Sequence, residues 1–264
     1  MASILDKFRI DNQVAVVTGA GRGIGQACAI ALAEAGADVV IAARSPNELQ
    51  STGSTIEATG RRAHIVVADL DDIDQVRGVA RAAGDTFGRL DVIVNNVGGA
   101  TPKPFLDSTV ADLEQAFHFN VSTAHALVTA AVPAMLENGG GSVVNISSVM
   151  ALVSGRGFLS YGVAKAALAK YTALAAQDLA PRIRMNAVAA GTIATSATAP
   201  ITEDAAWRAQ VEAATPLRRL GTVEDVAAAV VYLASPAGSY LTGAVLEVHG
   251  GLQAPNTQQA IPDL

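Results

Sequence analysis

Tyr161 and Lys165 are four positions apart, and Ser148 precedes the tyrosine by thirteen positions. If the tyrosine segment is helical, a spacing of four places both side chains on one face of the helix. An ammonium beside a phenol favours the phenolate, so we expect the Tyr161 pKa to fall from about 10 towards working pH. Such a phenol can donate or accept a proton at a carbonyl or alcohol oxygen. Because Tyr-x-x-x-Lys also occurs on ordinary helix surfaces, this interpretation depends on the rest of the chain.

A glycine-rich loop at residues 18–25 joins the first apolar run of the chain to a helical pattern. Glycines let a backbone turn tightly and approach a pyrophosphate, which then lies at the positive N-terminus of the helix. A strand, a glycine loop and a helix in this order predict a dinucleotide site, with a merely structural turn as the alternative. The contacts expected from this loop are Gly19, Arg22, Gly23, Ile24 and Gly25.

The residues after the second expected strand, 38–43, bear on the choice of dinucleotide. An acidic residue at this point would bind the ribose hydroxyls of NAD, but the chain has Arg44 there. The planar guanidinium of Arg44 suits the 2′-phosphate of NADP, and Arg22 is the second expected contact. We therefore predict NADP(H) as the preferred cofactor, with NAD(H) possible. The competing interpretation is that both arginines are solvated surface charges.

The elements that must position these residues alternate along the chain. Short apolar runs, continuous as in strands buried on both faces, are separated by stretches with helical periodicity. Seven strands joined by helices predict an α/β protein, a doubly wound parallel sheet in a single domain, 1–264. The expected strands are 13–18, 38–43, 64–68, 91–95, 142–147, 183–189 and 244–248, and the main expected helices are 24–35, 72–87, 111–136, 158–178 and 223–234.

Residues 191–216 interrupt this alternation. The segment carries small residues, two prolines and an amphipathic stretch between the sixth expected strand and the next helix. A long insertion at the carboxyl edge of a parallel sheet predicts a substrate lid. The tail from Leu252 onwards is expected to be extended.

The bulk composition excludes several classes of partner. A net charge of −6 argues against nucleic acid and anionic membranes as partners. The single cysteine, Cys28, excludes an intramolecular disulfide and fits a reducing compartment. The chain shows no basic-then-apolar leader, and no uninterrupted apolar run reaches the roughly 20 residues of a membrane span. We therefore expect a cytoplasmic protein.

Three motifs in order carry a family resemblance: the glycine loop, Asn-Asn-Val-Gly at 95–98, and the serine, tyrosine and lysine described first. Through them the chain resembles the short-chain dehydrogenase/reductase family over nearly its whole length, which implies a Rossmann fold. The resemblance also implies further cofactor contacts to adenine, to the adenosine ribose and to the nicotinamide carboxamide. These contacts are Asp69 and Leu70, then Asn96, Val97 and Gly98, and finally Gly191, Ile193 and Thr195.

The resemblance also implies the catalytic roles. Tyr161 is the acid/base, Lys165 lowers its pKa and binds the nicotinamide ribose, and Ser148 orients the substrate oxygen. Ser147 is the alternative serine. Asn120 matches the family's helix asparagine, whose main chain binds a water that links the lysine to solvent.

The chain departs from the family pattern at two positions. Ala190 stands where the family usually has proline, which we expect to loosen the lid, and His249 replaces an aspartate of the last strand. We expect His249 to be a terminal or interface residue. The other histidines, His64, His118 and His125, have no metal-ligand spacing, and we predict no metal.

The predicted activity is that of an NADP(H)-dependent oxidoreductase that interconverts a ketone and a secondary alcohol by hydride transfer. The loop at 98–105 is similar to that of bacterial 7α-hydroxysteroid dehydrogenases, which favours a bulky apolar, hydroxysteroid-like substrate. Apolar side chains suited to such a pocket are Met150, Leu152, Val153, Phe158 and Trp207.

Two alternatives stay open. A 3-oxoacyl thioester on acyl carrier protein is the first, but an acidic carrier needs basic docking residues, and residues 124–138 contain no lysine or arginine. The second is a non-catalytic NADP-sensing protein, because a fold does not fix a function. The resemblance further implies a homotetramer, or else a dimer.

Overall fold

The computed structural model describes residues 3–199, 203–257 and 261. A parallel seven-stranded sheet forms its centre, in the order β3-β2-β1-β4-β5-β6-β7. The doubly wound α/β fold predicted from the sequence is confirmed, and each strand boundary lies within one residue of its expected position. The strands are β1 (Val14–Thr18), β2 (Asp38–Ala43), β3 (Ala63–Val67), β4 (Val92–Asn95), β5 (Gly141–Ser148), β6 (Ile183–Ala190) and β7 (Val245–Val248).

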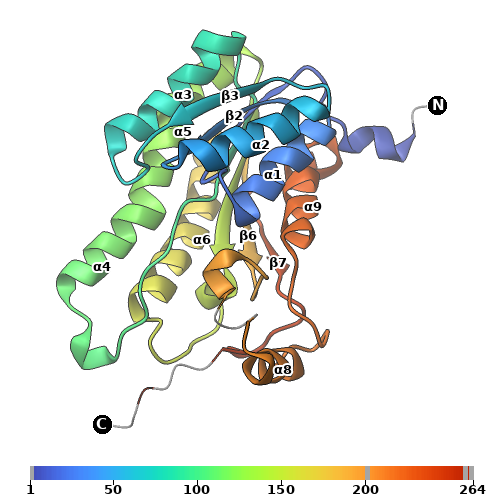
Figure 1. The fold of residues 1–264 in the computed structure, drawn as a ribbon. Coiled ribbons are helices and arrows are strands. Elements are labelled where there is room, and N and C mark those ends of the chain that lie inside the picture. The colour runs from blue at the N-terminus through green and yellow to red at the C-terminus, as the bar shows by residue number, and fades with distance from the viewer. Residues whose placement is uncertain (1–2, 200–202, 258–260, 262–264) are drawn as a thin grey trace.

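Helices cover both faces of the sheet (Figure 1). Along β1, Ala15 and Val17 pack in the core that α1, α2 and α9 share, whereas Val14 and Val16 pack in the core formed with α3, α5 and α6. Successive strand residues therefore anchor opposite layers. The helices are α1 (Gly23–Glu34), α2 (Pro46–Ala58), α3 (Ile73–Phe87), α4 (Val110–Phe117), α5 (Thr123–Glu137), α6 (Leu159–Leu179), α8 (Ala205–Ala214) and α9 (Val223–Ala234).

The strand order reverses between β1 and β4, which are neighbours in the sheet although two strands separate them in sequence. A crevice at the carboxyl ends of the strands is expected at such a point. The glycine loop leaves β1 there, Asn96 follows β4, Ser148 ends β5 and Gly191 follows β6. The topology thus brings all of these predicted site residues to one edge of the sheet.

The expected single helix at 111–136 is wrong in its interior. A five-residue π-helix, His118–Ser122, separates α4 from α5, and Thr123 N–H donates to the carbonyl of His118 five residues earlier. Such π segments often occur at functional sites. By length and composition alone, Val110–Glu137 could cross a membrane, but half of its most apolar window is buried inside the protein. Core helices of soluble proteins meet the same criterion.

Two segments extend the expected pattern. Helix α2, which was not among the predicted helices, begins with Ser45 as N-cap and Pro46 in the first helical position. Within 191–216 the structure has α8, capped by Asp204, and residues 200–202 lie outside the described part. The role of this segment as a lid stays a prediction. The short helices are η1 (Ile4–Phe8), η2 (Phe105–Asp107), η4 (Val149–Ala151), η5 (Ser196–Thr198) and η6 (Pro236–Gly238).

Candidate active site

Ser148, Tyr161 and Lys165 meet at the carboxyl edge of β5. Ser148 is the last residue of β5 and is 6% exposed, while Tyr161 lies in the first turn of α6 and Lys165 one turn further on. The Ser148 Oγ accepts the Met150 N–H at 3.1 Å, which leaves the hydroxyl proton free to donate. Ser148 and Tyr161 are joined by a side-chain hydrogen bond. The hydroxyl of the alternative serine, Ser147, donates to the backbone carbonyl of Lys165 at 3.1 Å, so its proton is already used in this hydrogen bond.

The Lys165 ammonium is buried beneath these hydroxyls. Its Nζ donates to the Ile146 carbonyl at 2.8 Å and lies 5.8 Å from the centroid of the Tyr161 ring. Burial lowers the pKa of Lys165 to about 8, because removal from water penalises the charged form. Lysine with such a pKa remains mostly protonated at neutral pH, although it gives up its proton far more readily than an exposed lysine.

The Tyr161 pKa moves in the direction opposite to that expected from the four-residue spacing. Burial raises the pKa of the phenol, and the hydrogen bond from Ser148 lowers it by a smaller amount. The phenolate loses water on burial, while the Lys165 ammonium is directed at the Ile146 carbonyl. In the protein alone, Tyr161 is therefore a neutral proton donor at neutral pH.

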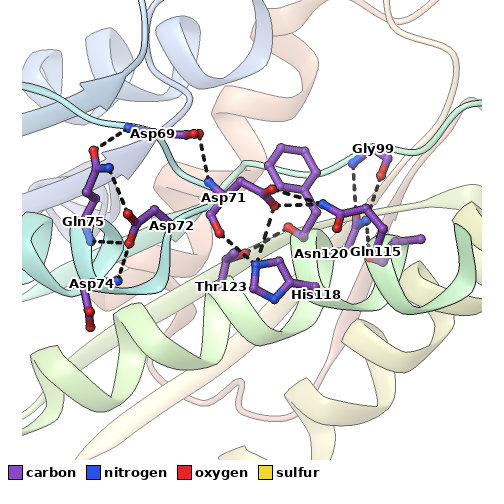
Figure 2. Close-up of polar contacts among 12 residues, drawn as sticks. Asp69, Asp71, Asp72, Asp74, Gln75, Gly99, Gln115, His118, Asn120 and Thr123 are labelled. Carbon is purple, nitrogen blue, oxygen red and sulfur yellow. Dashed lines mark hydrogen bonds and ion pairs between the residues drawn. The ribbon is translucent and has the colours of Figure 1, made fainter. Parts of the chain in front are cut away.

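Asn120 lies in the π-helix and holds the loop that follows β4. Its Nδ2 donates to the carbonyls of Ala116 at 2.8 Å and Gly99 at 2.9 Å, and its Oδ1 accepts the Gly99 N–H at 3.0 Å (Figure 2). The side chain is 1% exposed. A Cβ on Gly98 would lie 2.4 Å from Asn120 Oδ1 and 2.6 Å from Lys165 Nζ. Asn120 and Lys165 therefore flank the same glycine.

A polar network connects this helix to the loop after β3 (Figure 2). Gln115 Nε2 donates to both carboxylate oxygens of Asp71 at 3.1 Å, and His118 Nε2 lies 2.8 Å from the Asp71 carbonyl. On the other side, Asp69 N–H donates to Gln75 in α3 at 2.9 Å. The predicted adenine contact Asp69 is thus fixed by α3, while the neighbouring Asp71 is fixed by α4 and the π-helix.

The glycine loop is supported by Asn96. The Asn96 Nδ2 donates to the carbonyls of Thr18 at 3.0 Å and Gly19 at 3.3 Å, so this side chain holds the loop from below. Gly19 has a φ of +66° and Gly23 a φ of +59°, which other residues rarely adopt. A Cβ on Gly25 would lie 2.2 Å from the Gly19 carbonyl, so Gly25 permits the loop to fold on itself.

The loop fits a pyrophosphate. Helix α1 begins at Gly23, and its N-cap, Arg22, makes no side-chain capping hydrogen bond. The first N–H groups of a helix have no partner within the helix, so an uncapped start needs one from elsewhere. A phosphate at this N-terminus would supply acceptor oxygens and meet the positive end of the helix dipole.

The far end of the cleft carries two arginines and a carboxylate. Arg44 is exposed after β2, and the Arg22 side chain is 69% exposed. Glu48, in the first turn of α2, lines the same end of the cleft and was missed by the sequence analysis. Its position, four residues after Arg44 in a polar helical turn, is also typical of an ordinary surface residue. Proximity to the glycine loop appears only in the fold.

The loop after β6 closes the opposite end. Ile193 is 4% exposed and bridges to Gly221, and Thr195 N–H donates to the Thr198 hydroxyl at 2.9 Å. Asn256 of the C-terminal tail accepts from the Thr192 hydroxyl at 2.7 Å and donates to the Thr215 hydroxyl at 2.8 Å. The tail therefore joins the start of this loop to the end of α8. No motif in the sequence indicated this contact.

These elements enclose a cleft of about 900 Å³. Gly25 packs against the Gly19 carbonyl and Asn120 packs against Gly98, and neither Gly25 nor Asn120 lines the cleft. The predicted residues that do line it are Gly19, Arg22, Gly23, Ile24, Arg44, Asp69, Leu70, Asn96, Val97, Gly98, Ser148, Tyr161, Lys165, Gly191, Ile193 and Thr195.

An apolar pocket of about 750 Å³ lies between the loop before α4 and the segment after β5. Tyr161 packs against the cluster of Val149, Met150 and Leu252, to which the pocket residue Phe158 also belongs. Four of the five side chains that the sequence suggested for an apolar substrate pocket line it, namely Met150, Leu152, Val153 and Phe158. Trp207 instead packs against Val211 and Leu220.

His249 follows β7 directly, and both of its ring nitrogens have partners within the protein. Its Nε2 lies 2.5 Å from Glu247 Oε2, and its Nδ1 accepts the Leu252 N–H at 3.0 Å. Its side chain is 5% exposed. Within the part of the chain that the structure describes, no group of three or more His, Cys, Asp or Glu side chains could hold a metal ion.

The chain is similar to known proteins over most of its length. A family model described as enoyl-(acyl carrier protein) reductase matches residues 19–253. An uncharacterized oxidoreductase of Mycobacterium tuberculosis (strain CDC 1551 / Oshkosh) is 58% identical, covering 99% of this chain and 100% of that protein. An L-rhamnose 1-dehydrogenase (NAD(P)(+)) of Sphingomonas sp. (strain SKA58) is 41% identical, covering 92% and 97%.

A solved structure matches the fold closely. The 7α-hydroxysteroid dehydrogenase complexed with NADH and 7-oxo glycochenodeoxycholic acid superposes with a TM-score of 0.90 at 35% identity, covering 96% of this chain and 99% of that one. A 7α-hydroxysteroid dehydrogenase of Escherichia coli (strain K12) is also 35% identical in sequence. The similarity therefore extends through the whole length of the cleft-bearing fold.

Proposed function

The chain belongs to the short-chain dehydrogenase/reductase family, and from this premise we propose that it interconverts a bulky apolar ketone and its secondary alcohol with NADP(H). As a member, it is an oxidoreductase that acts on CH–OH groups with NAD(P), which sets aside the alternative of a non-catalytic sensor. The observation that carries the proposal is the group of buried Ser148, half-buried Tyr161 and buried Lys165 that lines the dinucleotide cleft.

When bound in the cleft lined by Tyr161 and Lys165, the nicotinamide cofactor would supply the hydride for the reduction and would accept it in the oxidation. The Tyr161 hydroxyl gives its proton to the carbonyl oxygen during reduction and takes it back during oxidation. The Ser148 hydroxyl, whose oxygen already accepts the Met150 N–H, donates to the same substrate oxygen. The Lys165 ammonium, 5.8 Å from the Tyr161 ring centroid, stabilises the phenolate left after proton transfer.

The preference for NADP(H) is proposed from charge at the adenosine end of the cleft. Arg44 follows β2 directly, in the place where a carboxylate would favour NAD. Arg22 lines the same end from the glycine loop. A guanidinium is well suited to phosphate oxygens, and both of these side chains are exposed to an entering phosphate.

The apolar pocket supports the proposed substrate class. Phe105 and Leu106 at its rim are 70% and 73% exposed, and Leu152 is 48% exposed. Exposed apolar side chains gathered around a hollow favour a ligand with a large apolar surface. The 7α-hydroxysteroid dehydrogenases among the relatives are named for substrates of that kind.

The proposal also covers the setting in which the enzyme works. We place it in the cytoplasm, where its one cysteine, Cys28, stays reduced and buried. We further propose a homotetramer or dimer that acts on a small molecule, without nucleic acid or membrane as partner. The net charge of −6 supports this choice of partner.

A substrate panel tests the proposal. Purified protein is assayed for NADPH and NADH oxidation with bile-acid ketones, small ketones, sugar lactones and a 3-oxoacyl thioester. Highest kcat/KM for the bulky apolar ketones with NADPH is the expected result. Highest kcat/KM for the thioester would instead favour the acyl-carrier alternative, and preference for NADH would overturn the cofactor assignment.

A further inference from the structure

The Glu48 carboxylate lies against the glycine loop at the adenosine end of the cleft. A Cβ on Gly21 would lie 2.9 Å from Glu48 Oε2, so the carboxylate is close to the backbone of the loop. Its other oxygen, Oε1, is 3.8 Å from the Arg22 guanidinium. Glu48 therefore touches the same end of the cleft as both arginines expected to bind a 2′-phosphate.

The other carboxylates at this end have their own partners. Asp71 accepts two hydrogen bonds from Gln115, and Asp69 Oδ1 accepts the Asp71 N–H at 3.2 Å. Among the residues that the structure describes, the Glu48 carboxylate has as partner only the Arg22 guanidinium at 3.8 Å, and the Arg22 and Glu48 side chains are 69% and 40% exposed. An exposed pair of this length is weak, so both groups can readily change partner when a nucleotide enters.

The two nucleotides would meet Glu48 in opposite ways. An NAD ribose presents a 2′-hydroxyl, which can donate a hydrogen bond to a carboxylate. An NADP ribose presents a phosphate with a charge of about −1.5 to −2, which the carboxylate repels and which competes with it for Arg22. The first turn of α2 already carries the negative charge of Glu48, so it offers less to a second anion.

We propose that Glu48 sets the ratio of NADP to NAD use, by opposing the 2′-phosphate and accepting a hydrogen bond from the 2′-hydroxyl. This inference rests on the proposed function, because it needs the adenosine end of the cleft to lie between Arg22, Arg44 and Glu48. Arg44 draws the enzyme towards NADP, and Glu48 limits that preference. The enzyme then uses both cofactors, and one carboxylate decides by how much.

The test compares two ligands that differ only in the 2′-phosphate. Adenosine 2′,5′-bisphosphate and 5′-AMP are titrated by calorimetry into the wild type, Glu48→Gln, Glu57→Gln and Arg44→Ala. Glu57 lies on the same helix but is exposed and outside the cleft, so its variant removes the same charge elsewhere. Thermal unfolding of each variant establishes that it is folded.

We expect Glu48→Gln to bind the bisphosphate about tenfold more tightly, with 5′-AMP binding unchanged or weaker. The ratio of kcat/KM for NADPH to that for NADH should rise by a similar factor, while Glu57→Gln leaves it near the wild-type value. Unchanged bisphosphate affinity in Glu48→Gln overturns the inference. If Arg44→Ala also fails to weaken the bisphosphate, the proposed NADP site is wrong as well, so the two failures are separable.

Discussion

The Lys165 ammonium lies 5.8 Å from the centroid of the Tyr161 ring and donates a hydrogen bond to the Ile146 carbonyl. The spacing of the two residues predicted their shared helix face, but the direction of the lysine side chain depends on β5. The positive charge therefore faces the ring of the proton donor while remaining fixed to the sheet. Burial of the Lys165 charge therefore lowers the free energy of unfolding, while its position near the Tyr161 ring assists proton transfer.

The folding cost has a measurable pH dependence. Because burial lowers the Lys165 pKa from 10.5 to about 8, the folded protein loses this proton at a lower pH than the unfolded chain. Between those pKa values the unfolded state binds more protons, so the free energy of unfolding rises with pH. Relative to Lys165→Met, the wild type should gain about 2 kcal/mol between pH 7.5 and 10.

Denaturant unfolding at several pH values measures this difference. Lys170→Met is the matched control, since Lys170 lies on the exposed side of the same helix. A wild-type curve parallel to that of Lys165→Met across the whole range would show that the buried ammonium is not responsible.

Gly98 is predicted to tolerate no side chain. A Cβ there would lie 2.4 Å from Asn120 Oδ1 and 2.6 Å from Lys165 Nζ. Gly98→Ala should displace both groups and lower kcat/KM by at least about a hundredfold, since small misplacements in a site have effects of this size. Gly84→Ala, in α3 with no atom within 4 Å of the added Cβ, should keep full activity. Equal kcat/KM for the two variants would contradict this account of the glycine.

Asn256 is predicted to keep the loop after β6 in place. It forms hydrogen bonds with the hydroxyls of Thr192 and Thr215, and each such hydrogen bond contributes about 1 kcal/mol to stability. Asn256→Ala should raise the KM for the cofactor about three- to tenfold with a smaller change in kcat. The exposed Gln253 of the same tail supplies the control, Gln253→Ala. An unaltered KM in Asn256→Ala would mean that the tail does not support the loop.

Features of the fold and the site could be predicted from the sequence where they depend on residues close together in the chain, and not where they depend on contacts between distant residues. Continuous apolar runs located every strand within one residue, because burial on both faces leaves little ambiguity. The π-helix at Asn120 was not predicted, and the partner of its asparagine side chain, Gly99, lies in a different loop 21 positions earlier in the sequence. Glu48 and Asn256 were missed for the same reason. Their partners, Arg22 and Thr192, lie 26 and 64 positions away in sequence.

In the proposed mechanism the Tyr161 hydroxyl carries the proton, and Tyr161→Phe removes that hydroxyl alone. Turnover of a ketone is measured together with NADPH binding. Tyr171→Phe serves as control, because Tyr171 lies on the same helix as Tyr161 and its hydroxyl is hydrogen-bonded to His125 of a different helix. We expect Tyr161→Phe to lose at least about a thousandfold in kcat while its Kd for NADPH stays within a factor of about three. Turnover close to that of the wild type would contradict it.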